Sequence, residues 1–443
     1  MEQKKLTTHL QHGLNGALAV PGDKSISHRA LMLGAIAQGT TTIKHFLSSA
    51  DCLSTLRAMQ DLGIKITRDG GDNVSVEGKG GLTGLKKPEH PLNMGNSGTT
   101  TRLLMGLLAG QSFETELFGD TSLQKRPMRR VSEPLAEMGG ASILTTSTGT
   151  LPAKVIGKPL QGAQVKLKVA SAQVKSALIL AALQAKTPST IIEKLPTRDH
   201  TERMLQEFGA QIETAADHLT ITVQPQPRLL GQTVIVPGDI SSAAFFIVAA
   251  TISKHSEIVL KNVNINETRT GILSVLQKMG GNLQLENKST GTEPAADLRV
   301  KYATLSPIQL DEKEIPPAVI DELPLVALLA ACAHGRSILR GAQELRVKET
   351  DRIATVAQEL RKLGVLVQEL PDGLIIDGRP AWDINDPVLD SHGDHRIGMM
   401  MAIAALRSPE ALALKKPEAI AVSYPTFFSD LESLITLGEE ESK

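Results

Sequence analysis

The stretch VPGDKSISHRALMLGAIA, residues 20–37, decides the fold, because its outline returns as VPGDISSAAFFIVAA at residues 236–250. In both stretches a Pro-Gly pair precedes a short polar cluster, and an apolar run with helical spacing follows. The cluster and the run occur four more times without the VPGD. The six polar clusters are residues 23–25, 96–99, 171–173, 239–242, 321–322 and 394–396. The chain therefore carries six copies of one unit.

A second signal closes each copy. A bulky apolar residue followed by glycine ends another helical pattern, roughly every 75 residues. These pairs are residues 62–63, 138–139, 208–209, 279–280, 363–364 and 437–438. Glycine suits the left-handed position at which helices end. A β-like segment such as FETELFG (113–119) lies between the two helical patterns, so each copy is an α/β unit that must pack against others to bury its faces.

The two VPGD segments predict where the chain passes between two globes. They stand directly before the first and the fourth copy, and Pro and Gly interrupt regular structure at such crossings. We expect a first globe of residues 20–237 and a second of residues 1–19 with 238–443, each of three copies. The crossovers would lie near Pro21 and Pro237. A chance match of two tetrapeptides remains the alternative.

Composition excludes several classes of protein. The 443 residues carry 47 basic and 48 acidic side chains, and this balance argues against a nucleic-acid partner. Apolar stretches such as 325–333 fall short of the roughly 18 residues that a membrane span needs, and no signal segment is visible at the start. Two cysteines, Cys52 and Cys332, fit a reducing compartment. We expect a cytoplasmic monomer.

The six helix starts predict binding of anions. A helix N-terminus carries free N–H groups and a partial positive charge. Plain capping by Ser, Thr, Asp and Asn is the alternative for any one cluster. Lys24, Arg102 and Arg396 lie at or just after three of the starts, where a cation opposes the helix dipole, and this favours an anion nearby. A cleft lined by such starts suits a substrate rich in phosphate and carboxylate groups.

Charged segments also precede the second helical patterns. They are QKRPMRR (124–130), PTRDHTER (196–203), NETRTG (266–271) and RVKETDR (346–352). In the last segment Lys348 and Arg352 are four residues apart, and we expect them to share one helix face. A solvated helix with mixed charges is the alternative.

Six segments in order resemble the 5-enolpyruvylshikimate-3-phosphate synthase family. They are PGDKSISHRA (21–30), GNSGTTTRLL (95–104), KRP (125–127), SAQVKSAL (171–178), RVKETDR (346–352) and GDHR (393–396). KSISHRA and RVKETDR are specific, whereas KRP and GDHR alone are weak. The resemblance covers nearly the whole chain, and IDELPLVALLA with PTRDHTERM is similar to the branch often called class II.

The resemblance implies both a fold and a reaction. The fold is α/β: two similar globular domains, each of three βαβαββ-type repeats, an inside-out α/β barrel with the active site in a cleft. Because the implied site residues fall in both globes, we expect the cleft to close on its substrates. The reaction transfers the enolpyruvyl group of phosphoenolpyruvate to the 5-hydroxyl of shikimate 3-phosphate and releases phosphate, in aromatic amino-acid biosynthesis. The family is the target of glyphosate, and Gly98 is the small residue of its sensitive type. We expect no cofactor and see no metal-ligand spacing.

The resemblance also assigns roles to individual residues. Those implied for shikimate 3-phosphate are Lys24, Ser25, Arg29, Ser171, Gln173, Arg198, Asp321 and Lys348. Those implied for phosphoenolpyruvate are Lys24, Asn96, Gly98, Arg126, Gln173, Arg352 and Arg396. Asp321 would be the base for the hydroxyl, and Glu349, with Lys24 as its partner, would protonate the methylene carbon.

Three positions depart from the family pattern. Ala172 stands where a second serine is common, and Glu344 replaces a substrate-binding asparagine. A phosphoenolpyruvate-contacting lysine of some members aligns near Val422-Ser423. Because of these departures, the resemblance does not assign the residues at that end of the pocket.

Other readings remain. The related transferase that acts on UDP-N-acetylglucosamine typically carries a KNA motif and a loop cysteine, but this chain has Lys24-Ser25-Ile26 and no cysteine near Lys125. An RNA 3'-phosphate cyclase would need a nucleotide-binding segment that is not seen. A catalytically silent anion-binding protein is the alternative from another class, and in it Asp321 would be only a helix N-cap.

Overall fold

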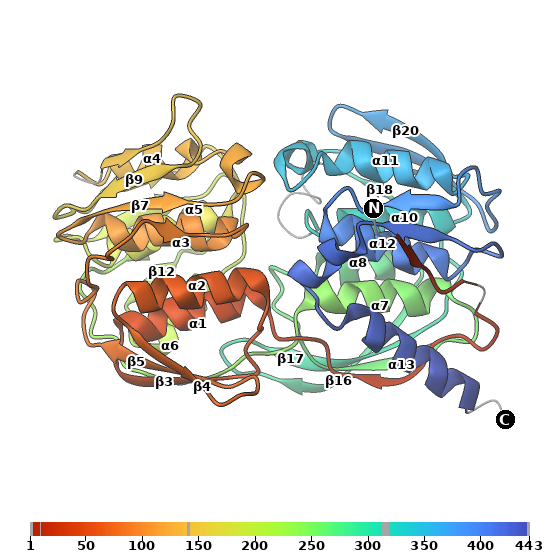
Figure 1. Cartoon of the computed structure of the whole chain (residues 1–443), viewed down its shortest axis with the longest axis horizontal. Helices are drawn as coiled ribbons and strands as arrows, with labels where there is room; N and C mark the ends of the chain where they lie inside the picture. Colours follow the sequence, from red (N-terminus) through yellow and green to blue (C-terminus); the bar gives the residue numbers. More distant parts are fainter. Residues whose placement is uncertain (1–2, 9, 140–141, 312–318, 441–443) are drawn as a thin grey trace. The chain divides into compact units, whose positions relative to one another are not determined.

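The computed structural model describes residues 3–8, 10–139, 142–311 and 319–440. The chain divides into two compact units (Figure 1): unit 1 is Met1–Pro21 with Pro237–Lys443, and unit 2 is Gly22–Val236. Each unit has its own aliphatic core. In the described ranges no helix is both long and apolar enough to cross a membrane.

Unit 2 contains three four-stranded sheets of one pattern. In each, the first pair of strands is parallel and the other two pairs are antiparallel. The strand orders are β14 (Thr233–Ile235), β3 (Gln38–Lys44), β5 (Val74–Lys79), β4 (Lys65–Arg68); β6 (Leu92–Asn93), β7 (Glu114–Phe118), β9 (Ala153–Ile156), β8 (Ser142–Leu144); and β10 (Gln164–Lys166), β11 (Ser189–Ile192), β13 (Thr220–Val223), β12 (Ile212–Thr214).

Unit 1 repeats the pattern twice and varies it once. The two four-stranded sheets run β2 (Asn15–Leu18), β15 (Glu257–Asn264), β17 (Ala295–Lys301), β16 (Asn282–Ser289); and β18 (Gln309–Leu310), β19 (Gly335–Leu339), β21 (Gly373–Gly378), β20 (Leu366–Leu370). The third sheet has three strands, β22 (Val388–Asp390), β23 (Ala413–Lys415) and β1 (Gln3–Lys5). Here β1 pairs antiparallel with β23, in the place that β21 takes beside β19.

The six polar clusters begin the six central helices. These are α1 (Lys24–Ile36), α3 (Gly98–Ala109), α5 (Ala172–Ala182), α7 (Ile240–Ile252), α10 (Leu323–Cys332) and α12 (His395–Ala405). Every residue of α7 and α10 is buried, as expected for helices that are apolar on all sides. Glycine permits the closest packing: a Cβ at Gly106 of α3 would lie 2.0 Å from the carbonyl oxygen of Ala177 in α5.

The second helices of the copies are α2 (Ala50–Asp61), α4 (Arg129–Ala136), α6 (His200–Glu207), α8 (Gly271–Lys278), α11 (Arg352–Lys362) and α13 (Phe427–Glu440). The glycines predicted to end the first five all have positive φ, from 78° to 98°. The prediction is wrong for the sixth, because α13 continues through Gly438 to Glu440. In the other copies the chain turns at the glycine into a strand of the same sheet. In the sixth, no strand follows α13 among the described residues; β1 from the start of the chain supplies the third strand of that sheet, and the sheet has no fourth strand there.

Each VPGD segment joins a strand of one unit to a helix of the other. Strand β2 pairs with β15 in unit 1, and the chain then enters α1 of unit 2. Strand β14 pairs with β3 in unit 2, and the chain then enters α7 of unit 1. The aspartate of each segment, Asp23 or Asp239, caps the helix that follows by accepting a backbone N–H.

Candidate active site

The first turn of α1 presents Lys24 and Ser25 in unit 2. Lys24 Nζ lies 2.5 Å from Asp51 Oδ2, in the first turn of α2, and about a quarter of the lysine side chain is exposed. No local pattern in the sequence predicts this pair, because 27 positions separate Asp51 from Lys24. The cation at this helix start therefore already has an anion within the protein.

Arg29 ties three helices together. Its Nε donates to Thr201 Oγ1 at 2.7 Å, its Nη2 donates to Ser176 Oγ at 2.7 Å, and its Nη1 donates to the carbonyl of Ser25 at 3.0 Å. The residue is buried. These three contacts hold the backbone of Ser25, which is among the residues predicted to bind shikimate 3-phosphate.

The start of α3 brings two guanidinium groups together in unit 2. Arg126 Nη2 donates to Asn96 Oδ1 at 2.6 Å, and Arg102 Nη1 donates to Gln173 Oε1. A Cβ at Gly98 would lie 3.3 Å from Arg126 Nη1 and 3.4 Å from Arg102 Nη1. Glycine therefore leaves the space between the two cations open. Four residues predicted to bind phosphoenolpyruvate are thus neighbours here: Asn96, Gly98, Arg126 and Gln173.

A buried charge cluster supports the segment that carries Arg198. Lys175 Nζ lies 2.9 Å from Glu193 Oε2 and 2.7 Å from Glu202 Oε1, and it donates to the carbonyl of Thr197 at 3.2 Å. Arg198 follows directly and is half-buried. Ser171 is the N-cap of α5, the helix that carries Lys175, and its side chain accepts the N–H of Val174.

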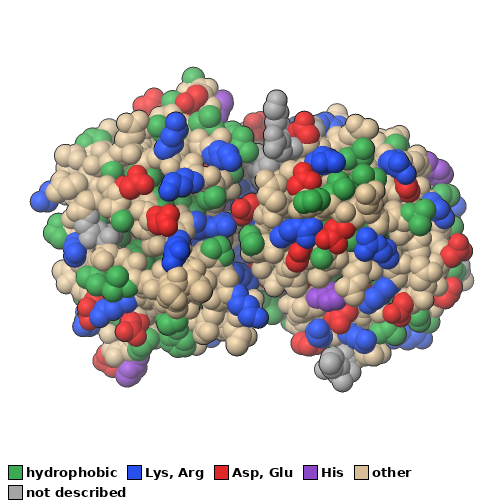
Figure 2. Space-filling model, turned by 90° about the horizontal axis from the view of Figure 1, so that it is seen from above, with side chains coloured by type: hydrophobic (Ala, Val, Ile, Leu, Met, Phe, Trp, Pro, Cys, Tyr) green, Lys and Arg blue, Asp and Glu red, His purple; other side chains and the backbone are tan. Residues whose placement is uncertain are grey.

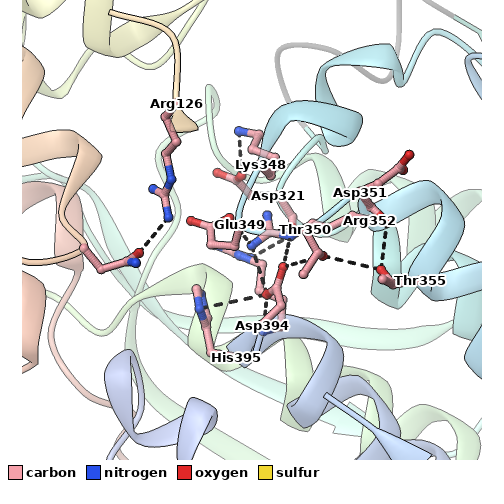
Figure 3. A network of polar contacts seen from close by, with 12 residues as sticks. Arg126, Asp321, Lys348, Glu349, Thr350, Asp351, Arg352, Thr355, Asp394 and His395 are labelled. Atoms are coloured by element: carbon pink, nitrogen blue, oxygen red, sulfur yellow. Dashed lines mark hydrogen bonds and ion pairs between the residues drawn. The ribbon is translucent and has the colours of Figure 1, made fainter. Parts of the chain in front are cut away.

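In unit 1, Arg352 lies at the centre of a polar network (Figure 3). Its Nε and Nη2 donate to the two carboxylate oxygens of Asp394 at 2.8 and 3.1 Å, and Nη2 also donates to Glu349 Oε2 at 2.6 Å. Burial alone would lower the pKa of Arg352, but the two carboxylates outweigh it and raise that pKa. Burial would also raise the pKa of Asp394, but Arg352 reverses this and lowers it. Both groups are therefore charged.

Asp321, Lys348 and Arg396 meet beside this network. Lys348 Nζ lies 3.5 Å from Asp321 Oδ1, and Arg396 Nη1 donates to the carbonyl of Asp321 at 2.7 Å. The N-cap of α10 is Glu322, so the alternative in which Asp321 is only an N-cap is wrong. Asp321 stands in the turn before it.

The expectation that Lys348 and Arg352 share a helix face is also wrong. Lys348 ends the 3-10 helix η2 (Gln343–Val347), and α11 begins only at Arg352. The reason is the side chain of Asp351, which caps α11 by accepting the N–H of Ala354 at 3.1 Å. The two cations therefore lie on different elements and have different partners.

The buried side chains His28 and Cys52 are not ionised near neutral pH. Burial lowers the pKa of His28 to about 3, so its imidazole is neutral. Burial raises the pKa of the Cys52 thiol to about 12, so it is not an activated nucleophile. Within the described ranges no group of three His, Cys, Asp or Glu side chains could hold a metal ion.

Each unit thus gathers one part of the predicted site. Unit 2 holds Lys24, Ser25, Arg29, Asn96, Gly98, Arg126, Ser171, Gln173 and Arg198. Unit 1 holds Asp321, Lys348, Glu349, Arg352 and Arg396. Among the departures, Glu344 lies in η2, and Ser423 ends the 3-10 helix η3 (Pro417–Val422).

Comparison with known proteins identifies the class. The solved structure of the enolpyruvyl transferase NikO from Streptomyces tendae aligns with a TM-score of 0.76 over 98% of this chain and 97% of that one. Its sequence identity is only 17%, so this likeness concerns the fold. Together with helix starts rich in Arg and Lys, it defines the chain as having the enolpyruvyl transferase fold. The predicted fold class is confirmed.

Sequence relatives narrow the class to one family. The family model described as EPSP synthase (3-phosphoshikimate 1-carboxyvinyltransferase) matches residues 9–431. A 3-phosphoshikimate 1-carboxyvinyltransferase of Lactiplantibacillus plantarum is 60% identical over 97% of this chain and 99% of its own length. The solved EPSP synthase from Acinetobacter baumannii is 42% identical, covers 98% of both chains and has a TM-score of 0.86. The chain belongs to the EPSP synthase family, which confirms the predicted enzyme class.

Proposed function

We propose that this transferase moves the enolpyruvyl group of phosphoenolpyruvate to the 5-hydroxyl of shikimate 3-phosphate, and that the predicted residues carry out the roles given to them. The observation that carries the proposal is the set around Asp321. The Asp321 carboxylate, just before the N-cap of α10, lies beside Lys348, and the cations Arg396 and Arg352 lie nearby in the same unit. A base and anion-binding groups are what this reaction requires.

The arginines supply the contacts for phosphoenolpyruvate. Guanidinium groups bind carboxylate and phosphate oxygens in pairs. In Arg352, Nε and Nη2 are engaged, and Nη1 has no partner among the described residues. Arg126 is likewise held through Nη2, by Asn96. These contacts restrict the rotation of both guanidinium groups, which favours a single orientation for binding an anion.

The chemistry runs in two steps. In the first, the 5-hydroxyl oxygen bonds to C2 of phosphoenolpyruvate, its proton passes to Asp321, and Glu349 protonates C3, giving a tetrahedral intermediate. In the second, the bond from C2 to the phosphate oxygen breaks, C3 returns its proton to Glu349, and the double bond re-forms. Over the whole reaction the hydroxyl proton leaves with the phosphate. Lys24 and Lys348 balance the negative charge of the substrates.

Phosphate release tests the activity. Purified protein is assayed with phosphoenolpyruvate plus either shikimate 3-phosphate or UDP-N-acetylglucosamine. Release with the first acceptor alone is expected. Release with neither, together with calorimetric binding of shikimate 3-phosphate, would support the silent anion-binding alternative.

An Asp321→Asn variant tests the base. We expect kcat to fall by about 10²–10⁴-fold, which is the usual contribution of a general base, while shikimate 3-phosphate binding stays within a few-fold. Asp297→Asn is the matched control, because Asp297 is a buried carboxylate on β17 of the same unit with partners Lys261, Asn262 and Asn287. Turnover of Asp321→Asn within about tenfold of wild type would remove Asp321 from the base role.

We further propose that the enzyme is a monomer and works in the cytoplasm. On the face shown in Figure 2, Lys and Arg are interspersed with Asp and Glu, and hydrophobic side chains form only small groups. Both cysteines are free and buried, which suits a reducing compartment. Light scattering coupled to gel filtration tests the monomer, and localisation of a tagged chain tests the compartment.

A further inference from the structure

Among the residues that the structure describes, those that contact the Arg396 guanidinium all do so through Nη1. Arg396 lies in the first turn of α12, where a cation opposes the helix dipole. Its Nη1 donates to the carbonyl of Asp321 at 2.7 Å and lies 3.4 Å from Glu322 Oε1. In the described part of the chain, Nη2 and Nε of this guanidinium have no partner. Whatever holds Nη1 therefore sets the direction in which the other two nitrogens point.

Glu322 is the charged group that holds Nη1. Its side chain is 2% exposed and lies at the N-terminus of α10, where the helix dipole favours a negative charge. It makes no capping bond to its own helix. Oε1 instead accepts from Ser241 and from Arg396. A buried carboxylate that does not cap its helix requires a different explanation.

Ser241 also binds the Glu322 oxygen that contacts Arg396. The serine lies in the first turn of α7, and its hydroxyl donates to Glu322 while accepting from Arg269 Nη2 at 2.9 Å. Arg269, in the charged segment 266–271, also lies 3.4 Å from Asp239, the N-cap of α7. The hydroxyl is thus oriented by a cation on one side and an anion on the other.

The resulting chain of contacts joins three helices of unit 1. Helices α7, α10 and α12 pack against one another in pairs. The contacts run from Arg269 through Ser241 and Glu322 to Arg396, and so connect the first turns of all three. Two cations and two carboxylates, counting Asp239, balance in charge.

We propose that Glu322 is a positioning residue for phosphoenolpyruvate: it holds Nη1 of Arg396 so that the remaining nitrogens of that guanidinium face the substrate. Ser241, held by Arg269, keeps Glu322 in the required rotamer. The inference rests on the proposed function, in which Arg396 binds phosphoenolpyruvate. Glu322 itself does not touch the substrate.

A purely structural role makes a different prediction. If Glu322 only stabilised the helix junction, its loss would lower the temperature of unfolding and affect both substrates alike. A positioning role acts on one substrate through one side chain. The KM for phosphoenolpyruvate should then rise while the KM for shikimate 3-phosphate stays unchanged, and the effect should disappear when Arg396 is absent.

The test is a double-mutant cycle on the full chain. Glu322→Gln keeps the size and one acceptor oxygen but removes the charge, and Arg396→Met removes the guanidinium. We expect Glu322→Gln to raise the KM for phosphoenolpyruvate roughly tenfold, as for loss of a charged hydrogen-bond partner, and the KM for shikimate 3-phosphate by less than twofold. In the Arg396→Met background the same change should add less than twofold. Asp297→Asn, the buried-carboxylate control, should leave both KM values unchanged.

Ser241→Ala provides an independent variant should Glu322→Gln fold poorly. It removes the hydroxyl that orients Glu322 and should raise the KM for phosphoenolpyruvate in the same selective way, by a smaller factor. Equal increases in both KM values, or the same factor in the wild-type and Arg396→Met backgrounds, would overturn the inference while leaving the role of Arg396 intact. An unchanged KM in Arg396→Met alone would overturn the role of Arg396, and the inference with it.

Discussion

Replacing Lys175 by methionine should destabilise unit 2 more than any surface substitution. The ammonium group lies within 3 Å of two carboxylates, Glu193 and Glu202, and all three side chains are at most 6% exposed. Methionine fills similar space but leaves both carboxylates without their cation. Removing one partner of a buried ion pair costs about 3–5 kcal/mol. Since domains are stable by about 5–15 kcal/mol, unit 2 would lose a large fraction of its stability.

The loss should depend on pH. Burial raises the pKa of Glu193 above its usual value, against the opposing effect of Lys175. A carboxylate with a raised pKa is more stable in the fold when protonated, so its contribution is fully present below about pH 4.5 and is lost as pH rises through its folded pKa. Without Lys175 that pKa rises further. The destabilisation should therefore be larger at pH 7.5 than at pH 5.5, by up to about 1.4 kcal/mol per pH unit for each proton taken up.

Urea denaturation of the variant tests both statements. The single tryptophan, Trp382, lies in unit 1, so its fluorescence follows that unit while circular dichroism follows both. The circular dichroism transition should shift to lower urea and precede the fluorescence transition. Adding Glu193→Gln and Glu202→Gln removes the unpaired charges and should restore most of the stability. A loss below 1 kcal/mol, or one that is equal at both pH values, would refute the reasoning.

Three further outcomes follow from single contacts. Gly98→Ala places a methyl group 3.3 Å from the guanidinium of Arg126 and 3.4 Å from that of Arg102. Both guanidinium groups must then shift by a few tenths of an ångström. Steady-state kinetics should show that the KM for phosphoenolpyruvate rises by roughly threefold to tenfold. Gly364→Ala strains a residue at φ 82° and sets a Cβ 2.0 Å from a backbone carbonyl, so tryptophan fluorescence in urea should report a loss of at least about 1 kcal/mol. Arg352 lowers the pKa of Asp394, so Asp394 stabilises the fold above about pH 4, and this contribution is lost as pH falls through its folded pKa. The difference in unfolding free energy between wild type and Asp394→Asn should therefore shrink below about pH 4.

Local signals in the sequence predicted the repeated elements well. Five apolar-Gly pairs end helices with a left-handed glycine, because the requirement for positive φ is local. The sixth pair, Leu437-Gly438, looks the same but lies within α13. Among the described residues no strand follows it, and the third strand of that sheet is β1, from the other end of the sequence. A pattern in a short window cannot report a pairing between residues about 410 positions apart.

The cations at the helix starts predicted nearby anions, but not where those anions come from. A cation at a helix start does need an anion, and the sequence led to the expectation of a substrate anion beside Lys24 and Arg396. The structure supplies protein anions for both, Asp51 and Glu322. Neither follows from spacing, since Asp51 lies 27 residues from Lys24 and Glu322 lies 74 residues from Arg396. Only the packing of neighbouring helices brings these pairs together.

The two arginines of unit 1 that are predicted to bind phosphoenolpyruvate, Arg352 and Arg396, therefore differ in what their loss would mean. Arg352 is fully buried and contacts Asp394 and Glu349 through two of its three nitrogens. Its removal would leave two carboxylates without their cation and would also remove a substrate-binding group. Arg396 is 15% exposed and is held at one nitrogen. A fall in activity at Arg352 would combine substrate binding with stability, because the same guanidinium serves both. At Arg396 the two effects are separable, and for this reason Arg396, rather than Arg352, is the side chain through which a positioning residue such as Glu322 can be detected.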